Sequence, residues 1–342
     1  MGGLAGILCE FVTMSDVPAL PFDALEPDRI IDAVEGLGFL CDRRLLALNS
    51  YENRVYQVGI EDGAPVIAKF YRPGRWSDAQ IREEHAFVFE LDAHELPVVA
   101  PLTVDNESLF QSGGFRFALF PRQGGHAPEL DDPVHLAALG RVLGRMHRIG
   151  AVRAFGHRPH LTPHSHGYEA VAFVAEHFIP AHLAPAYSAV TRDLLAHVDD
   201  RWAQVPSLST IRTHGDCHVG NVLWREAHPH FVDFDDARTA PAVQDLWMLL
   251  SGEREQRSAQ LVTVLDGYTE FADFDVRELA LIETLRTLRM LNYSAWLGRR
   301  WREPAFQMAF PWFDTTAYWE SHVLELKEQL AALAEPPLEL MR

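Results

Sequence analysis

The sequence predicts an α+β fold with two lobes, the first built on a small antiparallel sheet and the second mostly helical. Three observations support this prediction. Short β-rich runs separated by turns fill the first third of the chain, helical periodicity dominates the rest, and 342 residues with 48% hydrophobic content suffice for two lobes. We expect a flexible N-terminal extension at residues 1–26, the sheet lobe at 27–121 and the helical lobe at 122–342.

In the first lobe, a helix near residues 28–37 precedes the β-rich runs "LLALNSYENRVYQVGI" and "PVIAKFY". The turn "EDGAP" joins these runs into a hairpin. A second helix at 77–93 begins with a capping-box pair, Ser77 and Gln80. Further strands are predicted at 97–104, 109–111 and 115–120. These elements make a mostly antiparallel sheet with one inserted helix.

The second lobe is predicted to begin after a glycine-rich hinge at residues 123–125. Helical periodicity marks the segments 131–150, 243–252, 276–301 and 318–333. The stretch 157–186, rich in proline, histidine and alanine, is the least regular part of this lobe.

Composition excludes several kinds of partner. The net charge of −18 opposes binding to nucleic acid or to an anionic membrane, so an anionic ligand would need a local cationic site. Only Cys9, Cys41 and Cys217 are present, without a CxxC pair, so we expect a reducing cytoplasm and no disulfide. No apolar run approaches the length of a membrane span, and the opening "MGGLAGILCEF" lacks the features of a signal peptide. We expect a cytoplasmic monomer.

Lys69 is the first candidate for chemistry, because it interrupts the apolar strand "VIAKFY". Burying a lysine there is costly unless it is paired or contacts an anion, and the alternative is an edge lysine whose amine reaches water. Glu84 shares one helical face with Ile81 and Val88, whereas Glu83 is turned away by about 100°. We therefore predict an ion pair between Lys69 and Glu84, with Glu83 as the fallback.

The stretch "HGDCHVGN" contains the pattern H-x-D-x-x-x-x-N, and "FVDFDD" follows it closely. Phosphoryl transfer from ATP requires a lysine on the phosphates, a carboxylate beside the attacking hydroxyl and metal ligands, and carboxylate and amide oxygens suit Mg²⁺. Asp216 would orient the acceptor hydroxyl and accept its proton, while Asn221 and Asp233 would hold Mg²⁺, with Asp233 also bridging the phosphates. His214 would hold the loop, and Asp235 would assist the metal or support the loop. A solvated turn explains each aspartate alone, but the ordered set downstream of a strand lysine favours phosphoryl transfer.

Two weaker candidates lie on either side of this motif. Ser50 belongs to "NSYENRVYQ", between the first two strands, where a kinase covers the phosphates of ATP. This segment lacks GxGxxG, so phosphate contacts would come from backbone N–H groups and the Ser50 hydroxyl, although an ordinary turn is equally consistent. Asp245, a lone acid in "AVQDLWMLL", is expected to cap or tie down the catalytic loop.

The remaining prominent residues are assigned no chemistry. The histidines at 157, 160, 164 and 166 match no tight zinc spacing and are expected on a surface loop. The C-terminal tryptophans are assigned to packing, namely Trp296, Trp301, Trp312 and Trp319. We expect Arg286 and Arg289 to lie in solvent or to form ion pairs on their helix.

Taken together, the motifs "LNSYENRVYQ", "KFYRPGRW", "EEH", "HGDCHVGNVLW", "FVDFDDAR" and "PAVQDLWMLL" resemble the bacterial stress response kinase A family. The resemblance covers nearly the whole chain from about Leu25. It implies a protein-kinase-like fold of the aminoglycoside phosphotransferase and choline kinase type, and cytosolic serine/threonine protein kinase activity. It also implies that Asp216 accepts the proton, that Asn221 and Asp233 bind Mg²⁺, and that Ser50 touches ATP.

The expected reaction is transfer of the γ-phosphoryl group of ATP to a Ser or Thr hydroxyl of a protein, including the chain itself. The resemblance implies a role in stress response and in protection from programmed cell death. One alternative keeps the fold but takes a small alcohol such as an aminoglycoside, choline or an amino alcohol, and an acidic acceptor pocket would favour it. The other alternative is a non-catalytic nucleotide sensor, which the complete set of Lys69, Asp216, Asn221 and Asp233 opposes.

Overall fold

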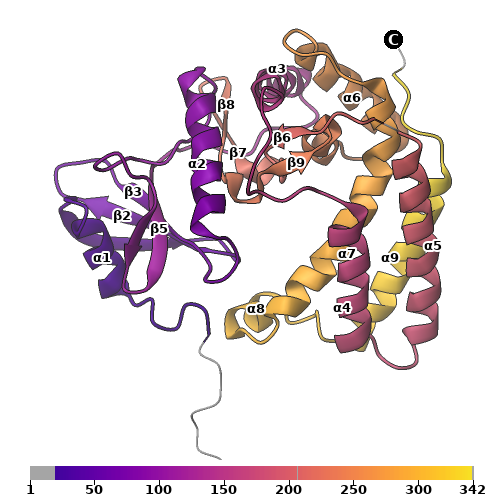
Figure 1. Cartoon of the computed structure of the whole chain (residues 1–342), viewed down its shortest axis with the longest axis horizontal. Helices are drawn as coiled ribbons and strands as arrows, with labels where there is room; N and C mark the ends of the chain where they lie inside the picture. The colour runs from indigo at the N-terminus through magenta and orange to yellow at the C-terminus, as the bar shows by residue number, and fades with distance from the viewer. Residues whose placement is uncertain (1–19, 206, 341–342) are drawn as a thin grey trace, which may run out of the picture.

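The protein folds into the two predicted lobes (Figure 1). A computed structural model describes residues 20–205 and 207–340. Most of the extension predicted at 1–26 therefore lies outside the described residues. A sheet with one helix on each face forms the first lobe, and helices with two small antiparallel strand pairs form the second.

The first lobe is built on a five-stranded antiparallel sheet in the order β1-β2-β3-β5-β4. Its strands are β1 (Cys41–Leu48), β2 (Arg54–Ile60), β3 (Val66–Phe70), β4 (Phe110–Ser112) and β5 (Phe115–Pro121). The turn between β2 and β3 spans residues 61–65, as the sequence predicts. Helix α1 (Pro27–Glu35) packs on one face of the sheet, and α2 (Asp78–Ala93) lies against the other.

The alternation of side chains along β3 decides where its lysine points. Ala68 and Phe70 belong to the apolar core that α1 covers, together with Phe117 of β5. Because successive strand residues face opposite sides, Lys69 projects toward α2. A shift of one residue in register would turn the lysine into the apolar core.

Helix α2 begins as the sequence predicts. The Ser77 side chain accepts the backbone N–H of Gln80, and the Gln80 side chain accepts that of Ser77, so both free donors at this terminus are satisfied. Glu84 is buried on the same face as Ile81 and Val88. The helix therefore presents an acid among apolar residues to the sheet.

Two predicted elements differ in the structure. The segment 97–104 forms no regular strand, and Val98 makes only an isolated parallel bridge with Phe231. Pro97 and Pro101 have no N–H to donate, which prevents a continuous ladder. The segment 243–252 forms two short 3₁₀ turns, η4 (Ala242–Asp245) and η5 (Trp247–Leu249), instead of a longer helix.

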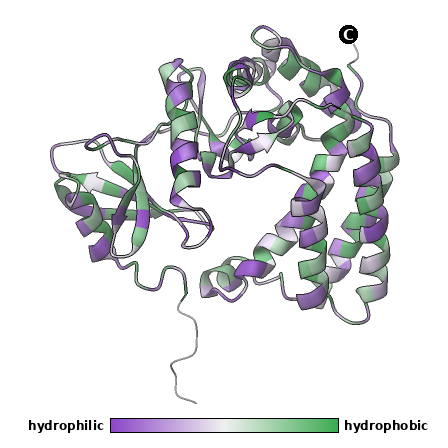
Figure 2. Cartoon of the chain, viewed as in Figure 1, coloured by the Kyte–Doolittle hydropathy of each residue, from purple (hydrophilic) through white to green (hydrophobic). Residues whose placement is uncertain are grey.

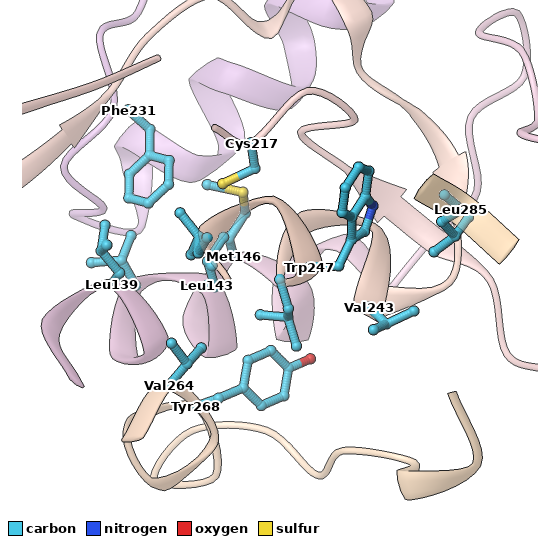
Figure 3. Packing of buried hydrophobic residues seen from close by; sticks show 14 of the residues in the cluster. Leu139, Leu143, Met146, Cys217, Phe231, Val243, Trp247, Val264, Tyr268 and Leu285 are labelled. Atoms are coloured by element: carbon cyan, nitrogen blue, oxygen red, sulfur yellow. The ribbon is translucent and has the colours of Figure 1, made fainter. Parts of the chain in front are cut away.

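The upper half of the second lobe contains helices α3 (Pro133–Gly150) and α6 (Arg254–Tyr268) packed side by side. Figure 3 shows Leu139, Leu143 and Met146 of α3 converging with Val264 and Tyr268 of α6. The same cluster includes Cys217, Phe231 and Trp247, so the polar loops of the lobe are anchored in one apolar core (Figure 3).

A bundle of helices forms the other half of this lobe (Figure 1). Its members are α4 (Glu169–His177), α5 (Ala184–Ala203), α7 (Ile282–Arg300) and α9 (Thr316–Ala334), with the short α8 (Pro304–Ala309) beside them. Hydrophobic and hydrophilic residues alternate along these helices (Figure 2), and their apolar residues meet in a second core around Trp319. Trp312 lies at the edge of this core, partly exposed, with its ring packed against that of Tyr318 at a centroid distance of 4.9 Å. Over residues 20–205 and 207–340, every helix is too short or too polar to span a bilayer.

Contact between α3 and α6 requires glycine. A Cβ placed on Gly140 would lie 2.0 Å from the carbonyl oxygen of Val264, well inside van der Waals contact. We expect Gly140→Ala to lower the free energy of unfolding by about 1–3 kcal/mol, because the clash outweighs the roughly 1 kcal/mol by which alanine favours a helix. Urea denaturation would measure the change, and equal or higher stability of the variant would contradict this account of the packing.

Candidate active site

Lys69 is buried at the boundary between the lobes, where carboxylates from both lobes surround it. Its Nζ lies 2.8 Å from Asp233 Oδ1, 3.3 Å from Asp235 Oδ1 and 4.0 Å from Glu84 Oε1. Burial alone would lower the pKa of Lys69, but these carboxylates outweigh it and hold the pKa well above its usual value. The amine is therefore a permanent positive charge aimed at the segment that carries Asp233.

Glu84, rather than Glu83, is the helix acid that faces the lysine. Burial raises the pKa of Glu84 to about 7, against the opposing effect of Lys69. Its second oxygen lies 3.7 Å from Arg158 Nη1, and both of these buried atoms lack a hydrogen-bond partner among the described residues. Glu83 instead accepts the backbone N–H groups of residues 156–158.

A β-hairpin brings the two halves of the motif together. Strands β7 (Val222–Arg225) and β8 (His228–Phe231) pair antiparallel, so Asn221 before β7 and Val232 after β8 meet at the same end, where Val232 N–H donates to the Asn221 carbonyl at 3.0 Å. Asp233 follows directly. The spacing between Asn221 and Asp233 in the sequence is the length of this hairpin.

Asp233 has an unusual backbone conformation. Its φ of 59° and ψ of 65° lie in the left-handed region, which non-glycine residues rarely adopt. Its carboxylate is half-exposed, at 51%, while that of Asp235 is only 4% exposed. The turn therefore directs Asp233 outward and Asp235 inward, where Arg75 and the buried Lys69 contact Asp235.

Asp216 lies on the loop between β6 (Ile211–Thr213) and the 3₁₀ turn η2 (Val219–Asn221). Its Oδ1 contacts Arg289 Nη1 at 2.5 Å, and its Oδ2 lies 3.3 Å from His218 Nε2. Burial would raise the pKa of Asp216, but the hydrogen bond from His218 and the charge of Arg289 hold it at about 2. The Asn221 amide donates to the Asp216 carbonyl at 3.0 Å, which fixes the orientation of this side chain.

Asp245 ties down the loop, as predicted. Its carboxylate is fully buried and accepts the backbone N–H groups of His214, at 2.7 Å, and Gly215, at 2.8 Å. His147 of α3 contacts the same carboxylate at 3.0 Å. His214 in turn contacts the Val232 carbonyl through Nε2, which joins the loop to the Asp233 segment. Gly215, with φ of +84°, packs so closely on the Asp236 carbonyl that a side chain would not fit.

The loop at residues 49–53 crosses toward the helical lobe. Glu52 receives Trp296 Nε1 at 2.6 Å, Arg300 Nη2 at 2.7 Å and Arg72 Nε at 2.9 Å. Tyr51 packs on Phe310 of the segment after α8, with ring centroids 4.8 Å apart. Ser50 makes no side-chain hydrogen bond within the described part of the chain, so its contact with ATP stays a prediction.

Comparison with known proteins assigns the chain to a family. Residues 44–282 match the model of the phosphotransferase enzyme family. Stress response kinase A of Escherichia coli (strain K12) is 45% identical over 323 residues, which cover 94% of this chain and 98% of that protein. The chain belongs to the stress response kinase A family of phosphotransferases. A relative from Salmonella typhimurium (strain LT2), named serine/threonine protein kinase RdoA, is 44% identical over 94% of this chain and 98% of that protein.

A solved structure supports the same fold. An amicoumacin kinase in complex with AMP-PNP, Ca²⁺ and Ami has a TM-score of 0.67 and 19% identity, and the alignment covers 90% of this chain and 94% of that one. The kinase fold of this phosphotransferase implies ATP as its co-substrate.

Three arginines of this phosphotransferase contact the site although its sequence motifs do not predict them. Arg289 was expected in solvent or paired on its own helix, whereas it contacts Asp216. Arg75 pairs with Asp235 and Asp236, and Arg158 lies over the Trp76 ring at 4.2 Å. The motif "KFYRPGRW" contained a signal for Arg75, but nothing in the sequence separates Arg158 or Arg289 from ordinary surface arginines.

The histidine-rich stretch is structured. His164–Tyr168 form a π-helical turn, η1, and the half-buried His166 contacts Arg238. Over residues 20–205 and 207–340, no group of three or more His, Cys, Asp or Glu is arranged to hold a metal ion.

Glu278 stabilises the turn η4, which carries Asp245, since its buried carboxylate accepts the Val243 N–H at 2.8 Å. Burial raises the pKa of Glu278 above its usual value, to about 7. A raised carboxyl pKa means that the folded state holds the proton more tightly than the unfolded state does. The contribution of Glu278 to the free energy of unfolding is therefore fully present below its unfolded-state pKa and is lost as the pH rises through its folded-state pKa. We expect the free energy of unfolding of the natural protein to fall by about 1–3 kcal/mol between pH 4.5 and 7 because Glu278 ionises. Glu278→Gln cannot ionise and should not show this part of the decrease. Urea unfolding of both proteins at pH 5 and pH 8 would test this, and a constant difference between them would contradict it.

Glu52 joins the loop at 49–53 to the helical lobe through its hydrogen bonds with Trp296 and Arg300. We expect Glu52→Gln, which keeps the shape but removes the charge that Arg72 and Arg300 share, to weaken backbone protection of the loop by about 1–3 kcal/mol and to raise KM for ATP. Hydrogen–deuterium exchange would measure the protection. Glu61→Gln, in the exposed β2–β3 turn, is the matched control, and equal exchange in both variants would show that the ion pairs do not hold the loop.

Proposed function

We propose that this protein is an ATP- and Mg²⁺-dependent serine/threonine protein kinase that acts in the stress response. The observation that carries the phosphoryl-transfer chemistry is the convergence of Lys69, Asp216, Asn221 and Asp233 at the boundary between the lobes. The protein acceptor is supported by the relative at 44% identity that is named a serine/threonine protein kinase.

Each residue has a separate role in the proposed reaction. Lys69, held in place by Glu84, neutralises phosphate oxygens of ATP, and the loop containing Ser50 covers them. Asp216, whose low pKa keeps it ionised, orients the acceptor hydroxyl and receives its proton. The low basicity of Asp216 suits a step in which positioning, rather than strong proton abstraction, is the main contribution.

The donor set fits Mg²⁺. Asp233 offers a half-exposed carboxylate, and Asn221 has its amide nitrogen engaged with the Asp216 carbonyl, so that its oxygen is the group left for a cation. One carboxylate and one amide, completed by phosphates and water, is the oxygen-rich set that Mg²⁺ accepts. When bound, the cation would neutralise charge on the phosphates, and this chain's Asp233 and Asn221 would hold it.

The alternative of a small alcohol acceptor has support from the amicoumacin kinase with the same fold. An acidic pocket beside Asp216 would favour a cationic small molecule. Asp216 instead contacts the guanidinium of Arg289, as well as His218, and the positive charge of Arg289 opposes an ammonium-bearing acceptor.

Turnover of γ-labelled ATP with Mg²⁺ tests the proposal. The protein would be assayed alone, with acidic and basic generic protein acceptors, and with a panel of small alcohols and aminoglycosides. We expect label on Ser or Thr of protein, and we expect Asp216→Asn to lower the rate about 10²- to 10⁴-fold because the proton acceptor is lost.

Lys69→Ala separates phosphate binding from acceptor chemistry, since it should weaken ATP binding as well as the rate. Arg192→Ala, on the exposed surface of α5, is a control for unspecific effects of removing a cation. Label confined to a small molecule would refute the protein acceptor, and full activity of Asp216→Asn would refute the role of Asp216.

A further inference from the structure

Arg289 occupies the position beside Asp216 that an acceptor has to approach. The two side chains meet at 2.5 Å, and His218 contacts the other carboxylate oxygen at 3.3 Å. The Arg289 side chain is 45% exposed, so solvent and ligands can reach it while it contacts Asp216. A hydroxyl that binds Asp216 Oδ1 therefore has to displace or share this cation.

Helix α7 places Arg289 at the end of a row of residues on one face. Arg289, Tyr293, Trp296 and Arg300 follow one another at helical spacings of four, three and four. Trp296 and Arg300 contact Glu52 of the loop at 49–53, and the Tyr293 and Trp296 rings stack with centroids 5.7 Å apart. This row thus runs from the loop that covers the phosphates to the proposed proton acceptor.

The arginines near this row are paired with acids, and two of these acids are each shared between two arginines. The Glu52 carboxylate is shared by Arg72 and Arg300, and Asp236 is held by Arg75 and Arg238. Arg289 has only Asp216 as its ion-pair partner among the described residues. The net charge of the chain is −18, so an acidic ligand would be repelled unless a local cation such as Arg289 attracted it.

We propose that Arg289 selects the acceptor, by binding a carboxylate that lies next to the Ser or Thr to be phosphorylated. This inference rests on the proposed protein kinase function. A guanidinium binds a carboxylate through two parallel hydrogen bonds, so an Asp or Glu of the acceptor competes with Asp216 for it. As Arg289 turns to the acceptor's acid, Asp216 is released to the hydroxyl.

The released Asp216 then takes part in a balanced step. The bond between the γ-phosphorus and the bridging oxygen of ATP breaks, and its electron pair leaves with ADP. A bond forms between that phosphorus and the acceptor oxygen, and the hydroxyl proton passes to Asp216. Arg289 is a positioning residue in this step, because it acts through the acceptor's carboxylate and through Asp216.

Three synthetic peptides test the inference with the full-length protein. Each peptide carries a single Ser in one neutral sequence, and flanking residues are Glu, Ala or Lys. We expect kcat/KM of the natural protein to be roughly twofold to fivefold higher for the Glu peptide than for the Lys peptide, as for one partly exposed charge pair. Arg289→Glu should invert this order, and Arg289→Lys should keep it in weaker form.

Charge-matched controls separate selection from a purely structural role. Arg192→Glu, on the exposed surface of α5, should leave the order of the three peptides unchanged. If Arg289→Glu lowers the rate for all three peptides equally, Arg289 only supports Asp216 and the inference is overturned. Arg289→Gln gives a second test that does not add repulsion with Asp216, and it should remove the preference without inverting it.

The assay also distinguishes failure of the inference from failure of the proposed function. Equal rates for all three peptides in the natural protein would overturn the selection by Arg289 while leaving a protein kinase. Label on no peptide and only on a cationic small alcohol in a parallel assay would overturn both.

Discussion

The structure depends on a buried, positively charged lysine that requires acidic partners. Lys69 is buried where the two lobes meet, and removing its charge from water is tolerable only because Asp233, Asp235 and Glu84 surround it. Two of these acids belong to the helical lobe. The electrostatic requirement of one strand residue therefore ties the two lobes together at the point where phosphates would bind.

The acids are in turn arranged by two short pairs of strands and one buried aspartate. The β7–β8 hairpin brings Asn221 beside the segment that carries Asp233. Strand β6 pairs with β9 (Arg238–Ala240), which brings the loop of Asp216 against the same segment. Asp245 then binds the backbone of that loop from the apolar core. Polar loops are thus held rigid by buried hydrogen bonds, which suits a site whose contribution is positioning.

The arginines define the opposite side of the same site. Arg75 and Arg158 compensate the inner acids, whereas Arg289 reaches Asp216 from the helical bundle. Cations and acids therefore lie side by side along this boundary of a strongly acidic protein. The loop at 49–53 joins this pattern through Glu52, which accepts hydrogen bonds from Trp296 and Arg300 of α7.

The sequence by itself determined the two-lobed α+β fold, the start of α2 and the residues of the phosphotransferase motif, because these depend on local hydrogen bonds, periodicity and a costly lysine in an apolar strand. Its choice of Glu84 over Glu83 followed from the helical period and agrees with the geometry. Periodicity failed at 97–104, where prolines interrupt backbone pairing, and at 243–252, where the chain forms two short 3₁₀ turns. Only the tertiary structure decided that Arg289 meets Asp216, 73 residues away in the chain, because a long-range ion pair depends on how α7 packs and leaves no trace in local sequence.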